Sequence, residues 1–522
     1  MKKLSDIIWL KNENNSIQNS QSNIQCVKEL LNSTGSGFCL AKFTQVTMHL
    51  GTGTTHACHH PTSRKVPIEA IETNPAVLFN TPHLKTARKE MLDGGRPNEC
   101  EYCWRIEDNN GISDRFYKSL EPWAINKHDY IQSGDPMQDY LPAYLEVDFS
   151  NVCNFKCAYC GPEYSTKWVE DLNQHGPIKL LENTEYLQWA QGWQRNLDSM
   201  TYKNSEFNPY LDAFWKWFPE VYKELKVYRI TGGEPLLSKE TFRSIDWLIE
   251  NPNPNLEFSI NSNLGAPEKL WNRFVDKIKI LVENKSVARF TIFTSVDGWG
   301  ERAEYARSGL NFGLFIQRFE QLLNIGNVRC TVMCTFNIFS VTSIMDLLSW
   351  QLALKRKYNN NSQASDLEIR YGFKINEVGD TFHARQLKNP SHSAIVGLDV
   401  PYLRNPSFLD AQYIDYNLIQ QYVIPAMHFV AKNTAIHAWN SHQGFEEYEL
   451  EKIKRICIQI MNKNKFSQDN DDQSTVINRA KFYDFVNELD KRNSSNFLAT
   501  FPEMEEFYNL CKESKNKLLG ND

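Results

Sequence analysis

The feature that most constrains the fold is a regular alternation of strand-like and helix-like segments from Ala143 onward. Repeated strand–helix units favour a parallel sheet with helices outside it, because each parallel crossover needs a long connection. The expected strands cover residues 144–149, 226–230, 256–260, 290–296, 328–337 and 367–375, and the expected helices include 241–250, 267–282, 312–325 and 343–356.

Three cysteines follow directly on the first expected strand. Cys153, Cys157 and Cys160 lie on one short segment, so their thiolates can converge on a single metal centre. A four-iron cubane usually takes four protein thiolates, and these three have no fourth cysteine near them in the sequence. One iron would then stay open for another ligand, as it does in catalytic metal sites. The alternative is a zinc knuckle, which usually closes with a fourth Cys or His.

A glycine-rich turn, Thr-Gly-Gly-Glu-Pro at residues 231–235, follows the second expected strand. Glycine lets a backbone approach a ligand closely, and proline stiffens a turn. Ligands of parallel α/β sheets and barrels bind at the carboxyl ends of the strands, where both this turn and the cysteine segment are expected. The alternative is an ordinary glycine turn.

The spacing Cys-x3-Cys-x2-Cys, with Tyr159 before the last cysteine, resembles the signature of the radical S-adenosylmethionine (radical SAM) enzymes. Residues 231–235 look like the GGEP motif of that family. The resemblance implies an α/β fold with a partial (β/α)6 TIM-like barrel. It also implies that the open iron of a [4Fe-4S] cluster binds SAM and that reductive cleavage yields a 5′-deoxyadenosyl radical, which abstracts hydrogen from a substrate.

The same resemblance implies where SAM would be held. Gly232 and Gly233 would approach its methionine amine, and Glu234 would support the turn. Arg307 could pair with the methionine carboxylate, or it could be a solvated charge on a helix surface. For Asn261 and Ser262, expected near the ribose, the alternative is an ordinary Asn/Ser turn. The expected SAM contacts are Tyr159, Gly232, Gly233, Glu234, Pro235, Asn261, Ser262, Ser295 and Arg307.

Four more cysteines precede the first expected strand. Cys39, Cys58, Cys100 and Cys103, with the runs around them, look like the ligand pattern of a twitch domain, a shortened relative of the SPASM domain. Four thiolates would complete an auxiliary [4Fe-4S] cluster with no open iron, serving electron relay or structure. Twitch domains more familiarly follow the barrel, and His59 stands where a paired cysteine is usual. A zinc ribbon is the main alternative.

The resemblance leaves the substrate open. A ribosomally made peptide is the first hypothesis, and a sugar or nucleotide is the second. An external electron donor such as a flavodoxin or ferredoxin is implied as a partner. A non-catalytic zinc-binding protein is the alternative from another class. His56, His59 and His60 are expected on a loop surface, with His59 the best candidate for an additional ligand.

Composition limits the remaining possibilities. A hydrophobic share of 41% is typical of a globular protein, and a net charge of −6 gives no sign of nucleic-acid binding. Neither a signal-peptide core nor an apolar run near the ~20 residues of a membrane span is found, which favours a cytoplasmic protein with reduced thiols. We expect three regions: a twitch-like cluster region at 1–140, the barrel at 141–376 and a mainly helical region at 377–522.

Overall fold

The fold is described here from a computed structural model of the chain. The structure describes residues 20–181, 184–185, 202, 206–359, 395–434, 443–465 and 472–520. The strand expected at 367–375 lies outside these residues.

One large sheet organises the described part of the chain, and its strand order is β13-β12-β10-β9-β8-β4-β1-β2-β3. All neighbours from β13 to β1 are parallel, whereas β2 and β3 add an antiparallel edge. The strands are β1 (Gln45–His49), β2 (Thr54–His56), β3 (Arg64–Lys65), β4 (Tyr144–Asp148), β8 (Val227–Thr231), β9 (Asn253–Ser262), β10 (Val287–Ser295), β12 (Val328–Met333) and β13 (Val396–Asp399).

The expected α/β class is confirmed, and five of the expected strands correspond to β4, β8, β9, β10 and β12. β13 occupies the place next to β12 and lies beyond residue 376, where the barrel was expected to end. On the other side, β1 pairs with β4 from before residue 140. The sheet therefore continues into both flanking regions, because parallel pairing joins strands that are distant in the sequence.

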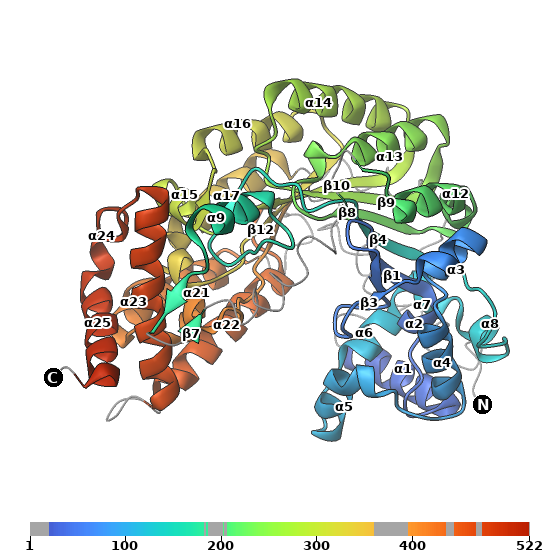
Figure 1. The fold of residues 1–522 in the computed structure, drawn as a ribbon, viewed down its shortest axis with the longest axis horizontal. Coiled ribbons are helices and arrows are strands. Elements are labelled where there is room, and N and C mark those ends of the chain that lie inside the picture. Colours follow the sequence, from blue (N-terminus) through green and yellow to red (C-terminus); the bar gives the residue numbers. More distant parts are fainter. Residues whose placement is uncertain are drawn as a thin grey trace.

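The two faces of the sheet differ in chemistry. On β4, Leu145 and Val147 point to one face and are fully buried, and Glu146 and Asp148 point to the other. Helices cover the apolar face: ring contacts join α12 to β8 and α14 to β10, and α13, α14 and α16 lie above the sheet in Figure 1. The covering helices are α12 (Pro209–Glu224), α13 (Lys239–Glu250), α14 (Glu268–Glu283), α16 (Phe312–Leu323) and α17 (Ile344–Tyr358).

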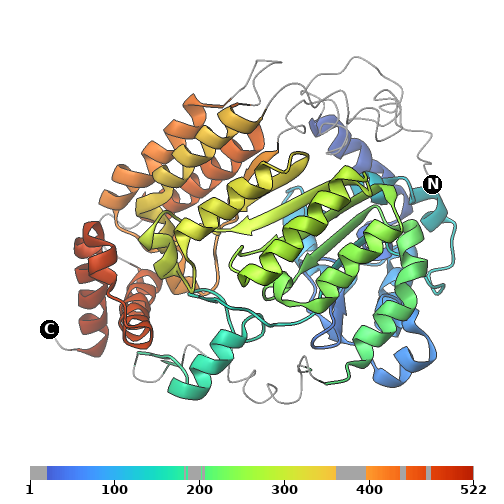
Figure 2. The same ribbon diagram turned by 90° about the horizontal axis from the view of Figure 1, so that it is seen from above.

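The N-terminal region packs below one end of the sheet, and the last helices form the opposite end of the molecule (Figures 1 and 2). The N-terminal helices are α1 (Ser20–Thr34), α2 (Ala41–Thr44), α3 (Ile68–Thr73), η4 (Pro75–Leu78), α4 (Pro82–Leu92), η5 (Asn98–Cys100), α5 (Glu101–Asp108), α6 (Asp114–Leu120), α7 (Pro122–Ile125) and α8 (His128–Gln132). After β13, the longer described helices are α21 (Ile424–Lys432), α22 (Glu447–Lys465), α23 (Gln473–Asn493) and α25 (Glu505–Leu519). Among the described helices, none has the length and apolar character needed to span a bilayer.

Candidate functional site

The loop after β4 carries Cys153, Cys157 and Cys160 at the carboxyl end of the strand. Its middle forms a two-residue strand, β5 (Lys156–Cys157), which pairs antiparallel with β11 (Arg307–Ser308). The Trp168 indole donates a hydrogen bond of 2.9 Å to the Cys157 carbonyl from α9 (Thr166–His175). The loop is therefore held from two sides.

The glycine turn after β8 packs directly against this loop. The Gly233 amide donates to the Ser150 carbonyl at 3.2 Å, and the Glu234 amide donates to the Val152 carbonyl at 2.8 Å. Gly232 has a φ of +120°, and a Cβ on Gly233 would lie 2.4 Å from the Val152 carbonyl oxygen. Both positions therefore need glycine, because a side chain would collide with the segment that leads into Cys153.

Glu234 connects the ends of two strands. Its carboxylate accepts hydrogen bonds from the Leu236 amide at 3.0 Å, the Ser262 hydroxyl at 2.8 Å and the Asn263 amide at 2.7 Å. Burial raises the pKa of Glu234 to about 7 although these donors favour the ionised form. These three contacts hold the turn after β8 against the end of β9.

The polar side chains at the end of β9 bind different neighbours. The Asn261 side-chain oxygen accepts a hydrogen bond of 3.1 Å from Arg229 on the polar face of the sheet. Ser262 is bound to Glu234. Asn263, which the sequence grouped with Asn261 and Ser262 near the ribose, donates to the Asn154 side chain at 2.9 Å and so reaches the cysteine loop.

Arg307 is buried beside the cysteines, with 6% of its surface exposed. Its guanidinium donates to both carboxylate oxygens of Asp297, at 2.8 and 3.1 Å, and a further nitrogen lies 3.5 Å from the Cys157 sulfur. The reading of Arg307 as a solvated surface charge is therefore wrong. Burial opposes its charge, but Asp297 raises the pKa of Arg307 well above its usual value.

Asp297 belongs to the run Ser-Val-Asp-Gly at residues 295–298, which the sequence placed at a strand end without assigning Asp297 a role. The Tyr159 hydroxyl donates to it at 2.9 Å, and the Thr335 amide donates at 2.9 Å. Its position just after a parallel strand was the available signal, because polar residues there face the ligand edge of a sheet. Ser295 is the last residue of β10, opposite Met333 of β12, and is partly buried.

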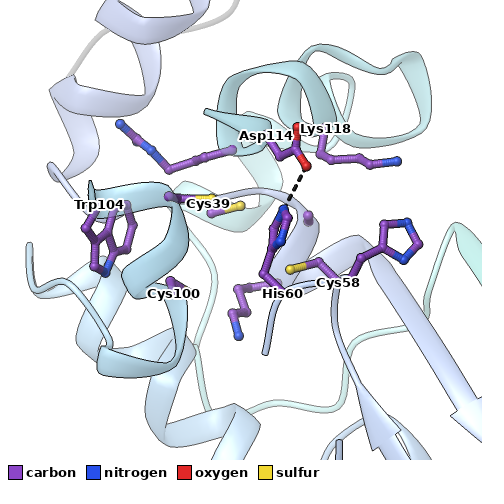
Figure 3. Close-up of a pocket in the computed structure, with 12 residues that line it drawn as sticks. Cys39, Cys58, His60, Cys100, Trp104, Asp114 and Lys118 are labelled. Atoms are coloured by element: carbon purple, nitrogen blue, oxygen red, sulfur yellow. Dashed lines mark hydrogen bonds and ion pairs between the residues drawn. The ribbon is translucent and has the colours of Figure 1, made fainter. Parts of the chain in front are cut away.

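The four upstream cysteines come together although up to 64 residues separate them in the sequence, from Cys39 to Cys103. They line one space of ≈ 490 Å³ that is continuous with solvent, and Cys39, Cys58 and Cys100 reach it from different segments (Figure 3). Lys42, His59, His60, Asp114, Arg115 and Lys118 line the same space. We call this space the four-cysteine cavity.

The histidines near this cavity have different surroundings. His60 lies 2.7 Å from the Asp114 carboxylate and stacks on Tyr102 with ring centroids 3.8 Å apart. His59 is exposed and lines the cavity. His56 was expected on a loop surface, but it is the last residue of β2 and is partly buried, because β2 pairs with β1 in the sheet.

A short polar chain lies between the two groups of cysteines. His56 Nδ1 contacts the Cys58 carbonyl oxygen, and its Nε2 lies 3.2 Å from Nε2 of His49 on β1. His49 Nδ1 lies 3.4 Å from an Asp148 carboxylate oxygen at the end of β4. The parallel pairing of β1 with β4 brings these residues together, which no local sequence pattern indicated.

Burial raises the pKa values of the cysteine thiols at both places: to about 12 for Cys153 and Cys100 and about 11 for Cys103. Thiolates are the form that binds metal, so binding must displace these protons. Within the described residues, no three Cys, His, Asp or Glu side chains meet closely enough to hold one metal ion.

Comparisons with known proteins find similarity among solved structures. No family model matches the chain, and no curated protein matches it. The chain is similar to two crystal structures of Streptococcus suis SuiB, one of them bound to S-adenosylmethionine. Each has 13% sequence identity and a TM-score of 0.27; the match covers 69% of this chain and 72% of SuiB in the S-adenosylmethionine complex or 71% in the other structure.

Proposed function

We propose that this protein is a radical SAM enzyme that cleaves S-adenosylmethionine reductively and abstracts hydrogen from a substrate. The observation that carries the proposal is the backbone contact between the Gly232–Gly233–Glu234 turn and the loop of Cys153, Cys157 and Cys160. Two motifs 70 residues apart thus form one site at the carboxyl ends of neighbouring parallel strands, where ligands of α/β folds bind. In this proposal β4, β8, β9, β10, β12 and β13 are the strands of a partial barrel.

Cys153, Cys157 and Cys160 are the proposed ligands of a [4Fe-4S] cluster with one open iron. They fit this group because they share one loop, and the fourth coordination place would be left to SAM. When bound, cluster and SAM together supply the 5′-deoxyadenosyl radical. The chain's own part is to hold these groups in place and keep water out.

The contacts within the protein refine the proposed SAM site. Arg307 already holds Asp297 and reaches the Cys157 sulfur, so we assign it to positioning the loop, and Ser295 stays the candidate for the methionine carboxylate. Gly232, Gly233 and Pro235 would border the methionine end, and Tyr159, Asn261 and Ser262 the nucleoside. Glu234 supports this edge through its three hydrogen bonds.

The four-cysteine cavity is the proposed site of a second, auxiliary [4Fe-4S] cluster. A cubane is bulky and takes one thiolate per iron, so its ligands surround a space instead of meeting at a point. Cys39, Cys58, Cys100 and Cys103 surround such a space. This cluster would relay electrons between a substrate and an external donor such as a flavodoxin or ferredoxin. The proposed substrate is a peptide, with a sugar or nucleotide as the alternative.

Anaerobic reconstitution with iron and sulfide tests the proposal. Two cubanes predict a brown protein with about eight irons per chain. With dithionite and SAM it should form 5′-deoxyadenosine, and Cys157→Ala should abolish this product. Cys26→Ala, on α1 and outside both groups, is the control and should retain it. A colourless protein that binds zinc, or full 5′-deoxyadenosine formation by Cys157→Ala, would refute the proposal.

Cys100→Ala tests the auxiliary site separately. It should hold about half of the iron, since one cubane of two is lost, and should still cleave SAM. Iron content equal to that of the wild-type protein would exclude Cys100 from the site.

A further inference from the structure

Lys42 places a buried charge at the wall of the four-cysteine cavity. It is the second residue of α2, only 2% of its surface is exposed, and it lines the cavity together with the four thiols. Lysine is rarely buried to this degree unless it is paired.

Glu99 supplies the opposite charge next to Lys42, although it does not itself line the cavity. Its carboxylate forms an ion pair with the Lys42 ammonium, and its side chain is 12% exposed. It also contacts His83, and it immediately precedes Cys100 in η5. The pair therefore joins a buried ammonium group to a largely buried carboxylate that stands beside one of the four cysteines.

Adding an electron makes an iron–sulfur cluster more negative, and its reduction potential depends on nearby charge and solvent exposure. Charges act strongly where little water screens them. On the basis of the auxiliary cluster in the proposed function, we infer that the Lys42–Glu99 pair sets the reduction potential of that cluster. Lys42 stabilises the reduced form, and Glu99 stabilises the oxidised form.

Arg115 also lines the cavity, but its contacts indicate a structural role. Its guanidinium donates to both Glu107 carboxylate oxygens at 2.9 and 2.7 Å, to the Phe38 carbonyl at 2.9 Å and to the Asn32 side chain at 3.0 Å. These bonds tie α6 to α5 and to the segment before Cys39. Lys42 is instead joined to the residue beside one cluster ligand, so its charge is the better candidate for tuning.

The test is an EPR-monitored redox titration of the reconstituted protein with both clusters. Lys42→Met should shift the midpoint potential of the auxiliary cluster to more negative values, and Glu99→Gln should shift it to more positive values. The double variant should lie close to wild type, because the two charge changes cancel. Lys85→Met removes the same charge from an ion pair with Asp139, outside the cavity wall, and should leave the potential unchanged.

The iron content separates this inference from the proposed function. A wild-type protein with only about four irons would refute the auxiliary cluster itself. About eight irons with no shift in Lys42→Met, or with shifts of the same sign in both single variants, would overturn the role of the charge pair alone. If Lys42→Met does not fold, Glu99→Gln and Lys42→Gln carry the same opposed signs.

Discussion

Gly232 and Gly233 shape the candidate site through the side chains that they lack. The position of a Cβ on Gly232 is taken up by the Asp148 carboxylate, and that of Gly233 by the backbone of residues 151 and 152. The motif therefore fixes how closely the turn approaches the cysteine loop. Ligand contact by these glycines stays a prediction, whereas their packing against the loop is evident from the distances.

Gly233→Ala should displace the cysteine loop, because the new methyl group would lie 2.4 Å from a carbonyl oxygen that cannot rotate away. We expect a loss of about 1–3 kcal/mol in the free energy of unfolding, the usual range for overpacking. Urea unfolding measures this loss, and iron analysis should show less iron bound. Gly313→Ala in α16 is the control, since its Cβ would meet only the Asn311 side chain at 3.6 Å. Equal stability of the two variants would contradict the packing argument.

Asp297 neutralises the buried charge of Arg307 through an ion pair. Asp297→Asn keeps the shape of the side chain but leaves the guanidinium without its counter-charge. Removing one partner of a buried pair is expected to reduce the free energy of unfolding by about 3–5 kcal/mol. The exposed pair Lys89–Asp93 gives the control, because Asp93→Asn should change it by less than about 1 kcal/mol. Similar losses in both variants would show that burial does not decide the effect.

At the scale of elements, the ends of neighbouring strands are joined by side chains. Glu234, at the end of β8, binds the end of β9 through Ser262 and Asn263, and Asn263 binds Asn154 in the loop after β4. The ends of β8, β9 and β4 are thereby connected, and the contact between Asn263 and Asn154 links β9 to β4 past β8, which lies between them in the sheet. The site's geometry thus depends on the strand order as much as on the motifs.

Glu234 should make stability depend on pH. Because burial raises its pKa from 4.5 to about 7, the folded protein binds this proton more tightly than the unfolded chain does. The free energy of unfolding should therefore fall as the pH rises from about 4.5 to about 7, by up to about 3 kcal/mol. Glu234→Gln lacks this contribution. Urea unfolding at pH 5 and pH 8 measures the stability of both proteins. Relative to the variant, wild type should be less stable at pH 8 than at pH 5. An equal difference at the two pH values would refute the raised pKa of Glu234.

At the scale of the whole molecule, the C-terminal helices reach the cysteine loop through charges. Arg492 of α23 donates to Asp171 of α9 at 2.8 Å, and the other Asp171 oxygen binds Lys156, the neighbour of Cys157. Arg492 also donates to the carbonyls of Gly176 and Pro177 at 3.0 and 3.2 Å. The helical C-terminal region therefore supports the site from a distance, which gives it a role that no motif indicated.

Arg492→Met should loosen this connection. The Arg492 side chain is 1% exposed, and removing its charge leaves Asp171 with Lys156 as its one ion-pair partner among the described residues. We therefore expect a loss of about 3 kcal/mol in the free energy of unfolding. The reconstituted variant should also lose iron from the first cluster faster in the presence of a chelator. Arg455→Met on the exposed side of α22 is the control. Unchanged iron release in Arg492→Met would show that the contact between α23 and α9 does not affect the cysteine loop.

The sequence alone was informative where chemistry and structure are local. Short strand-like apolar runs predicted β4, β8, β9, β10 and β12 within a few residues, because parallel strands bury many of their side chains. The cysteine spacing and the glycine turn identified the candidate site for the same reason, since each motif lies within one loop. The strand expected at 367–375 lies outside the described residues, and the strand that pairs with β12 is β13, from a segment that the sequence pattern had not selected.

Tertiary structure alone decided what depends on contacts between distant segments. It joined β1 to β4 across the expected domain boundary and paired Arg307 with Asp297. It also formed the cavity that Cys39, Cys58, Cys100 and Cys103 line, a grouping that the sequence resemblance had implied. It also buried Lys42 beside those cysteines. Composition and spacing specify which chemical groups a chain carries and which secondary structure each segment prefers. Burial and partnership are set by packing between segments, and these determine which of those groups hold a charge, a proton or a neighbouring loop.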